Sequence, residues 1–159
     1  MCISAANYII NQINLKNAEK KWNVVLSSKR LQKLLYFCDV LYMTENDGVS
    51  MFKDEYYAWP SGPVLPDVYN TFMRYQDGMM HPYNETIHDL KDEKIMNVVD
   101  RVLNDTADIS TNDLIEESHI TDGPWKDAVE IKAGEFNGVI DKINIYEYYS
   151  KKGVPYGMR

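Results

Sequence analysis

His119 is the histidine whose neighbours could support acid–base chemistry. Glu116, Glu117 and Asp122 lie within three residues of it, and Trp125 follows six residues later. A carboxylate can hold an imidazole in the orientation that a general base needs. No pattern typical of a nucleophile accompanies this group, however. The sequence therefore favours a structural role, in which His119 closes the C-terminal end of a helix.

Metal and nucleotide sites are not indicated by the spacing of the other candidates. His81, His88 and His119 are never three or four residues apart, and neither Cys2 nor Cys38 has a CxxC partner. The sequence also has no P-loop and no GxGxxG fingerprint that would cradle a phosphate. We therefore expect no metal, no cofactor and a reduced, cytoplasmic protein in which the thiol of Cys38 is buried.

The charge distribution favours basic partners. The 159 residues include 17 Lys and Arg against 24 Asp and Glu, which gives a net charge of −7. Residues 16–33 are basic and include one aromatic residue, Trp22, so they could touch nucleic acid. Because the acidic body repels phosphate, we interpret this segment as a solvated connector and do not expect a nucleic-acid partner. No apolar run approaches the length of a membrane span, and the N-terminus lacks the pattern of a secretory signal.

Tryptophan and tyrosine are unusually prominent, with three and twelve copies respectively. Trp59 and Trp125 both stand beside Pro or Gly turns. Large aromatic rings fill cores, and they also dominate binding hot spots, so both interpretations stay open for these two residues. Tyr148 and Tyr149, near the C-terminus, favour a role at the surface.

The elements that must position these side chains are mainly helical. The strongest pattern is a helix over residues 28–45, capped by Ser27 or Ser28, whose apolar face widens until little polar surface remains. Such a helix is central and buried. Further helices are predicted over residues 3–14, 66–76, 91–104 and 110–117, and from Asn144, which forms a capping-box pattern with Glu147.

The β-structure expected is one short hairpin over residues 50–59, with its turn at Lys53-Asp54-Glu55. Several prolines then interrupt regular structure until Pro66 begins a helix. The predicted fold class is mainly α: a single compact domain of five to six helices with one small β-hairpin. Residues 1–26 would form an N-terminal helix and basic connector, residues 27–152 the main domain, and residues 153–159 an irregular, mobile tail.

Several motifs stand in the order typical of a known family. The buried helix contains LQKLLYF (residues 31–37), Ala58-Trp59 and Gly62-Pro63-Val64 follow, and Ser118-His119 and Pro124-Trp125 stand downstream. Together they resemble the Panacea domain family, which includes SocA-like antitoxins and GepA-like phage-associated proteins. The resemblance covers about residues 27–150. The residues that match the family's motifs are Lys33, Leu34, Tyr36, Phe37, Ala58, Trp59, Gly62, Pro63, Val64, His119, Pro124 and Trp125.

The motif residues predict scaffold roles. Lys33 is a polar residue in an apolar helix, and we expect its ammonium group to reach the surface or to pair with an acid. Gly62 would permit a backbone conformation that other residues resist, and Pro63 would fix how the chain approaches the next helix.

The resemblance implies an antitoxin that is not an enzyme and that neutralises a cognate toxin, encoded by an adjacent gene, by binding it directly. Such toxins are commonly basic, and an acidic binder would attract them electrostatically.

 
 The alternatives are an adaptor that presents a client to a protease, a phage-associated protein of another role, and an enzyme centred on His119. The enzyme hypothesis requires that His119→Ala abolishes activity. We expect partner contacts from exposed edges of five aromatic residues, namely Trp59, Tyr69, Trp125, Tyr148 and Tyr149.

Overall fold

The computed structural model describes residues 2–84, 90–120, 123–131 and 137–158. In these ranges the chain forms seven α-helices, three short strands and one 3₁₀ turn. None of the helices described is long and apolar enough to cross a membrane. In chain order the elements are α1 Cys2–Ala18, α2 Ser28–Glu45, β1 Tyr56–Trp59, β2 Gly62–Val64, α3 Pro66–Phe72, α4 Glu93–Thr106, α5 Thr111–Ser118, α6 Pro124–Ile131, β3 Val139–Ile140, α7 Lys142–Lys152 and η1 Pro155–Gly157.

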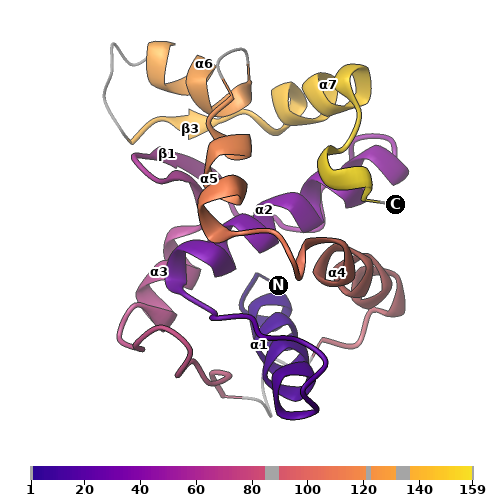
Figure 1. The fold of residues 1–159 in the computed structure, drawn as a ribbon. Coiled ribbons are helices and arrows are strands. Elements are labelled where there is room, and N and C mark those ends of the chain that lie inside the picture. Colours follow the sequence, from indigo (N-terminus) through magenta and orange to yellow (C-terminus); the bar gives the residue numbers. More distant parts are fainter. Residues whose placement is uncertain (1, 85–89, 121–122, 132–136, 159) are drawn as a thin grey trace.

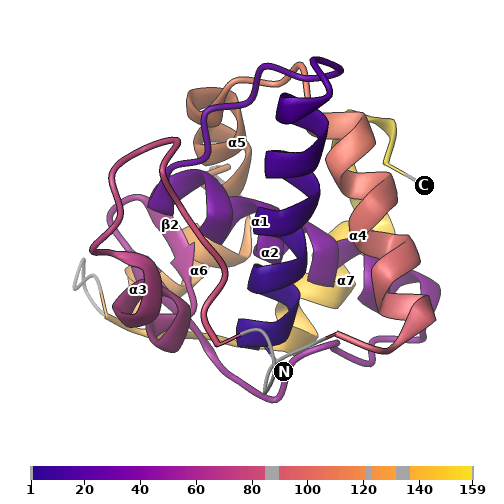
Figure 2. The same cartoon turned by 90° about the horizontal axis from the view of Figure 1, so that it is seen from below.

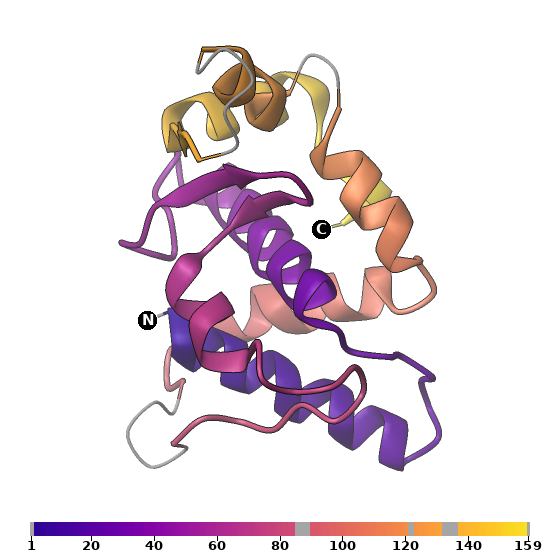
Figure 3. The same cartoon turned by 90° about the vertical axis from the view of Figure 1, so that its left-hand side faces the viewer.

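Helix α2 runs through the middle of the molecule (Figure 1). Helices α1 and α4 lie side by side on one side of it (Figure 2). The small sheet, α6 and α7 lie on the opposite side (Figure 3). Every residue of α2 from Arg30 to Leu41 is buried, the thiol of Cys38 included. The predictions of a mainly helical fold and of a central, buried helix are therefore confirmed.

Helix α1 packs into the same hydrophobic core as α2. Its stripe of Ala6, Ile9, Ile10 and Ile13 is at most 1% exposed, and these side chains belong to one cluster with the apolar residues of α2 and α4. The basic connector after α1 is tied back to it by Asn17, whose amide donates to the Val24 carbonyl at 2.7 Å and accepts from the Val24 amide at 3.0 Å. The N-terminal helix is thus an integral layer of the fold.

Ser27 caps α2 as predicted, since its hydroxyl accepts a hydrogen bond from the Arg30 amide at 3.0 Å. Ser27→Ala is expected to lower the free energy of unfolding by about 1 kcal/mol, because the amide loses its partner at the helix end. For a chain of this size the melting temperature should fall by about 2–4 °C. Ser150→Ala, at an exposed position inside α7, is the control for thermal unfolding. Equal melting temperatures for the two variants would show that the cap contributes nothing.

The hairpin lies later in the chain than predicted. Strands β1 and β2 pair with Trp59 opposite Gly62, so the turn is at Pro60-Ser61 and the predicted turn at residues 53–55 is wrong. Gly62 has a φ of 111°, a conformation that glycine adopts without strain. Pro63 is compatible with β2 because β2 is an edge strand in the order β2-β1-β3. The third strand, β3, was not predicted, because two residues carry no recognisable alternation.

Asp39 of α2 explains why residues 50–55 are not a strand. Its carboxylate is fully buried and accepts hydrogen bonds from the Ser50 hydroxyl at 2.7 Å, the Met51 amide at 2.8 Å and the Tyr56 hydroxyl at 2.9 Å. Burial raises the pKa of Asp39, while these three hydrogen bonds oppose that rise. The segment before β1 therefore takes its conformation from a side chain of α2 rather than from a neighbouring strand.

The last third of the chain differs from prediction in two helices. Helix α6 was not predicted: Pro124 occupies its first turn, where a proline is tolerated, and buried Ala128 and Val129 follow. Helix α7 begins at Lys142, because the Asp141 carboxylate accepts from the Ile143 amide at 2.9 Å. Asn144 is therefore not the N-cap.

The C-terminal residues are also more regular than the predicted tail. Residues Pro155–Gly157 form a 3₁₀ turn, and the Met158 side chain is buried. The Tyr156 hydroxyl donates to the Asp113 carbonyl at 2.9 Å, and its ring contacts that of Phe37 with centroids 6.5 Å apart. These contacts join the end of the chain to α5 and α2.

Candidate partner-binding groove

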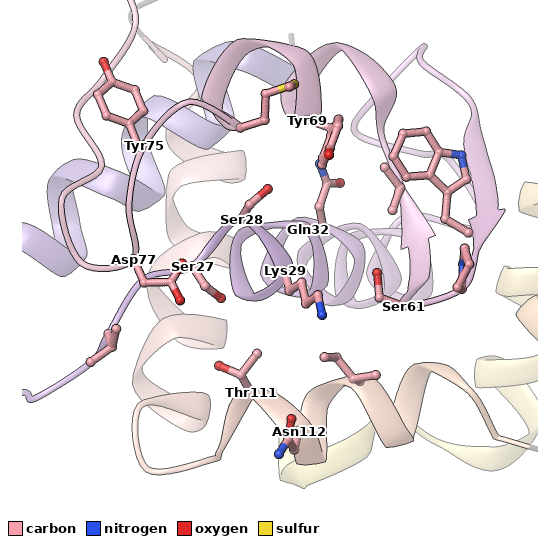
Figure 4. A pocket seen from close by; sticks show the side chains of 16 residues that line it. Ser27, Ser28, Lys29, Gln32, Ser61, Tyr69, Tyr75, Asp77, Thr111 and Asn112 are labelled. Carbon is pink, nitrogen blue, oxygen red and sulfur yellow. The ribbon is translucent and has the colours of Figure 1, made fainter.

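A groove of about 780 Å³ opens between the first turn of α2, the β1–β2 turn, α3 and α5 (Figure 4). Its lining is mostly aromatic side chains, aliphatic side chains and short hydroxyls. Lys29 and Asp77 are the charged residues among the described lining. Such a lining can bury apolar groups of a partner while offering hydrogen bonds around them.

Trp59 and Tyr69 form one end of the groove. Their rings meet edge to face, with centroids 5.1 Å apart and an interplanar angle of 75°. The Trp59 backbone is held from behind by Trp125, whose indole N–H donates to the Trp59 carbonyl at 2.8 Å. Both groove rings remain partly exposed, so they present an apolar surface whose position is set by the scaffold.

Gln32 fixes the start of α3 and therefore the position of Tyr69. Its side-chain oxygen accepts from the Leu65 amide at 2.9 Å, and its side-chain nitrogen donates to the Leu65 carbonyl at 3.2 Å. Leu65 immediately precedes α3, and Tyr69 lies one turn into that helix. A buried side chain of α2 thus sets the distance between the floor of the groove and one wall.

Arg30 fixes the opposite wall. Its guanidinium donates to the carbonyls of Thr106 and Ile109 at 2.9 and 2.8 Å and to the Thr111 hydroxyl at 3.3 Å. These contacts join the end of α4 and the start of α5 to α2. The neighbouring Lys29 is exposed and extends into the groove between α2 and α5 (Figure 4).

Lys33 does not reach the surface, and no acid among the described residues forms an ion pair with it. Its side chain is fully buried, and the ammonium nitrogen donates to the Pro63 carbonyl at 2.8 Å. Burial, with a smaller contribution from the charge of Lys29, lowers the pKa of Lys33 to about 7. The expectation of a surface-seeking or acid-paired lysine is wrong, because β2 packs directly over this position and leaves no route to solvent.

His119 stacks on Trp125, with ring centroids 4.0 Å apart and an interplanar angle of 28°. Its backbone N–H donates to the carbonyls of Ile115 and Glu116, so His119 closes the C-terminal end of α5 as predicted, through its backbone rather than its ring. Burial and the charge of Lys33 lower the pKa of His119. The adjacent Ser118 hydroxyl is buried and donates to the Ile115 carbonyl at 2.7 Å. The imidazole thus serves packing, and among the described residues no carboxylate accepts a hydrogen bond from it and orients it as a base.

Metal ligands are not gathered anywhere in the ranges that the structure describes. His81 contacts the ring of Tyr75, with centroids 5.9 Å apart, and lies far from His119 along the chain. His88 and Asp122 lie outside the described residues.

The five predicted anchors fall into three groups, those in the groove, those that are buried and one that is partly exposed elsewhere. Trp59 and Tyr69 line the groove. Trp125 is 8% exposed and Tyr149 is 2% exposed, so neither ring presents the open edge that the sequence predicted. Tyr148 is partly exposed on α7, where its hydroxyl accepts from the Lys152 ammonium group at 2.8 Å. Helix α7 contributes no residue to the groove lining.

The remaining motif residues belong to the scaffold, and Val64 among them also lines the groove. The Tyr36 ring contacts those of Phe37, Tyr56 and Tyr149 with centroids 5.3 to 6.4 Å apart. The side chains of Leu34, Tyr36, Phe37, Ala58 and Val64 are at most 3% exposed, and Pro124 is buried.

Sequence reasoning missed several residues of the groove. Met73 and Asp77 come from the end of α3 and the loop after it, whereas Thr111 and Ile115 come from α5, and no local pattern joins these two walls. One signal was available: Met73 is a large apolar residue that lies off the stripe of Leu65, Val68, Tyr69 and Phe72. An apolar residue on the outer side of an amphipathic helix indicates a contact with something other than the core.

The fold and the groove define a class of protein: a mainly helical scaffold with an open groove at its surface. The chain belongs to the family described as antitoxin SocA-like, Panacea domain, whose pattern matches residues 31–126, from α2 into α6. It is 30% identical over 115 residues to antitoxin SocA of Caulobacter vibrioides (strain NA1000 / CB15N). That match covers 65% of this chain and 60% of the relative's length. The resemblance inferred from the motifs is confirmed, and no solved structure matches the chain.

Proposed function

We propose that this protein is an antitoxin-type binding module that neutralises a cognate toxin by direct contact in the cytoplasm. Membership of the SocA-like Panacea family and similarity to a protein named antitoxin SocA support this role. The observation that carries it is the preformed groove with the Trp59–Tyr69 pair, on a domain of that family. The toxin is expected to be encoded by an adjacent gene, and a net charge of −7 favours a basic partner.

A growth assay tests the proposed function. The product of the adjacent gene is induced alone and then together with this protein, and the pair is purified through a tag on one of them. Arrest alone, growth together and a stoichiometric complex are the expected results. If the adjacent gene's product arrests growth, and this protein neither restores growth nor binds that product, direct neutralisation would be contradicted.

The binding hypothesis makes a prediction for His119. We expect His119→Phe to leave growth rescue unchanged, because phenylalanine keeps a ring against Trp125 while removing every acid–base function. Growth of cells that express the toxin with each variant is the measurement, and thermal unfolding checks that the variant is folded. Loss of rescue by a folded His119→Phe variant would instead support an enzyme centred on His119.

A further inference from the structure

Exposed apolar side chains gather at the mouth of the groove. Val25 is 61% exposed and Met73 is 54% exposed, and both line it beside the partly exposed rings of Trp59 and Tyr69. Aromatic rings that are held in place supply contact area at a low cost in conformational entropy. Methionine can adapt its shape to an uneven apolar surface. The groove therefore combines rigid anchors with one adaptable contact.

The walls of this groove are held before any partner arrives. Gln32 and Arg30 tie α3 and α5 to α2, as described above. The loop that carries Asp77 is tied to the connector before α2, since the Gly78 amide donates to the Leu26 carbonyl at 2.9 Å. A preformed surface avoids much of the ordering cost of association.

Acidic side chains predominate on the segments that form the walls. Asp67 and Asp77, on and after α3, and Asp113 and Glu116, on α5, are all exposed. The basic side chains on the same segments are Lys29 and Arg74, and the Arg74 guanidinium lies over the ring of Tyr75 at 5.0 Å. Lys29 and Asp77 line the groove itself and balance each other, and the other acidic side chains lie at neighbouring positions on the same segments. The partly apolar lining therefore lies within surroundings of net negative charge. Such a surface complements an apolar side chain flanked by lysine or arginine.

We propose that this groove is the toxin-docking surface and that its occupant is a segment of the toxin with a large apolar side chain flanked by Lys or Arg. The assignment rests on the proposed function and adds the binding face and the chemistry of the bound segment. The same charges disfavour two other occupants. A second copy of this acidic chain and the phosphates of a nucleic acid would both be repelled by the acidic side chains around the groove and by the net charge of −7.

Two charge-introducing substitutions with matched controls test this assignment. Met73→Lys places a cation on the groove wall, and Met79→Lys does the same at a methionine that is 60% exposed and is not among the groove-lining residues. Asp77→Lys reverses a charge of the lining, and Asp108→Lys reverses an exposed charge after α4. The probe is the product of the adjacent gene, separated from its complex in denaturant and refolded. Association and dissociation rates are measured at low and high salt.

Met73→Lys is expected to raise the Kd at least tenfold, and Asp77→Lys to slow association several-fold with a weaker dependence on salt. Both controls should stay within twofold of the parent protein. Unchanged binding of folded Met73→Lys and Asp77→Lys variants, or equal losses in the controls, would overturn the groove assignment while leaving the proposed function intact. A probe that does not bind the parent protein would overturn both. A dimer of the free chain that Met73→Lys dissociates would show that the occupant is a second copy.

Discussion

Gly62→Ala is expected to destabilise the fold by about 3 to 5 kcal/mol. The φ of 111° at this position is one that residues with a Cβ atom rarely adopt, which costs on the order of 1–3 kcal/mol. The new Cβ would also lie 2.5 Å from the Ser118 hydroxyl and 2.7 Å from the Lys33 ammonium nitrogen. Both side chains are buried, so neither can move away without disturbing the contact between β2, α2 and α5. Overpacking of this kind typically adds about 1–3 kcal/mol.

Urea unfolding measures this effect, and Gly157→Ala is the matched control. Gly157 also has a positive φ, of 66°, but a Cβ there would meet nothing within 4 Å. Gly157→Ala should therefore cost only about 1 kcal/mol, from backbone strain alone. Adding Ser118→Ala to Gly62→Ala should recover part of the loss by removing the closest contact. A Gly62→Ala variant no less stable than Gly157→Ala would contradict the close packing of these three elements.

Lys33→Met is expected to change how stability depends on pH. Burial lowers the pKa of Lys33 from 10.5 to about 7, so between these pH values the unfolded chain binds a proton that the folded chain does not. The free energy of unfolding of the parent, relative to the variant, should therefore rise with pH across this window, by at most about 1.4 kcal/mol per unit. Below about pH 7 both states are protonated and the slope disappears.

The balance at a given pH follows from two opposing contributions. Methionine removes the cost of burying a charge, but it leaves the Pro63 carbonyl without the hydrogen bond from Lys33, a loss of about 1–3 kcal/mol. We expect Lys33→Met to be the more stable protein near pH 7 and the parent to be the more stable one near pH 10. Chemical unfolding at several pH values measures the difference, with Lys151→Met, at an exposed position of α7, as the reference. A difference independent of pH would show that Lys33 keeps its ordinary pKa.

The groove shows how far the candidate site could be anticipated. Trp59 was predicted as an anchor because large rings beside turns are typical of binding surfaces, and Tyr69 was predicted with it. The same reasoning was applied to Trp125, whose ring is buried. The burial of Trp125 and Tyr149 could not be read from their own neighbours in sequence. It depends on contacts with Trp59 and Tyr36, which are distant along the chain. The burial of Lys33 also could not be read from its neighbours in sequence, because its environment is set by strand β2 rather than by its own helix.

The sequence by itself determined the mainly helical class, the central position of α2, the cap at Ser27 and the family. These features follow from repeats and hydrogen bonds within a few residues of the chain, or from the order of motifs. Tertiary structure alone decided the register of the hairpin, the pairing of β3 and the assembly of the groove from four segments. The physical reason is that hydrogen-bond partners such as Asp39 with Met51, and burial by distant elements, select among conformations that are locally equivalent.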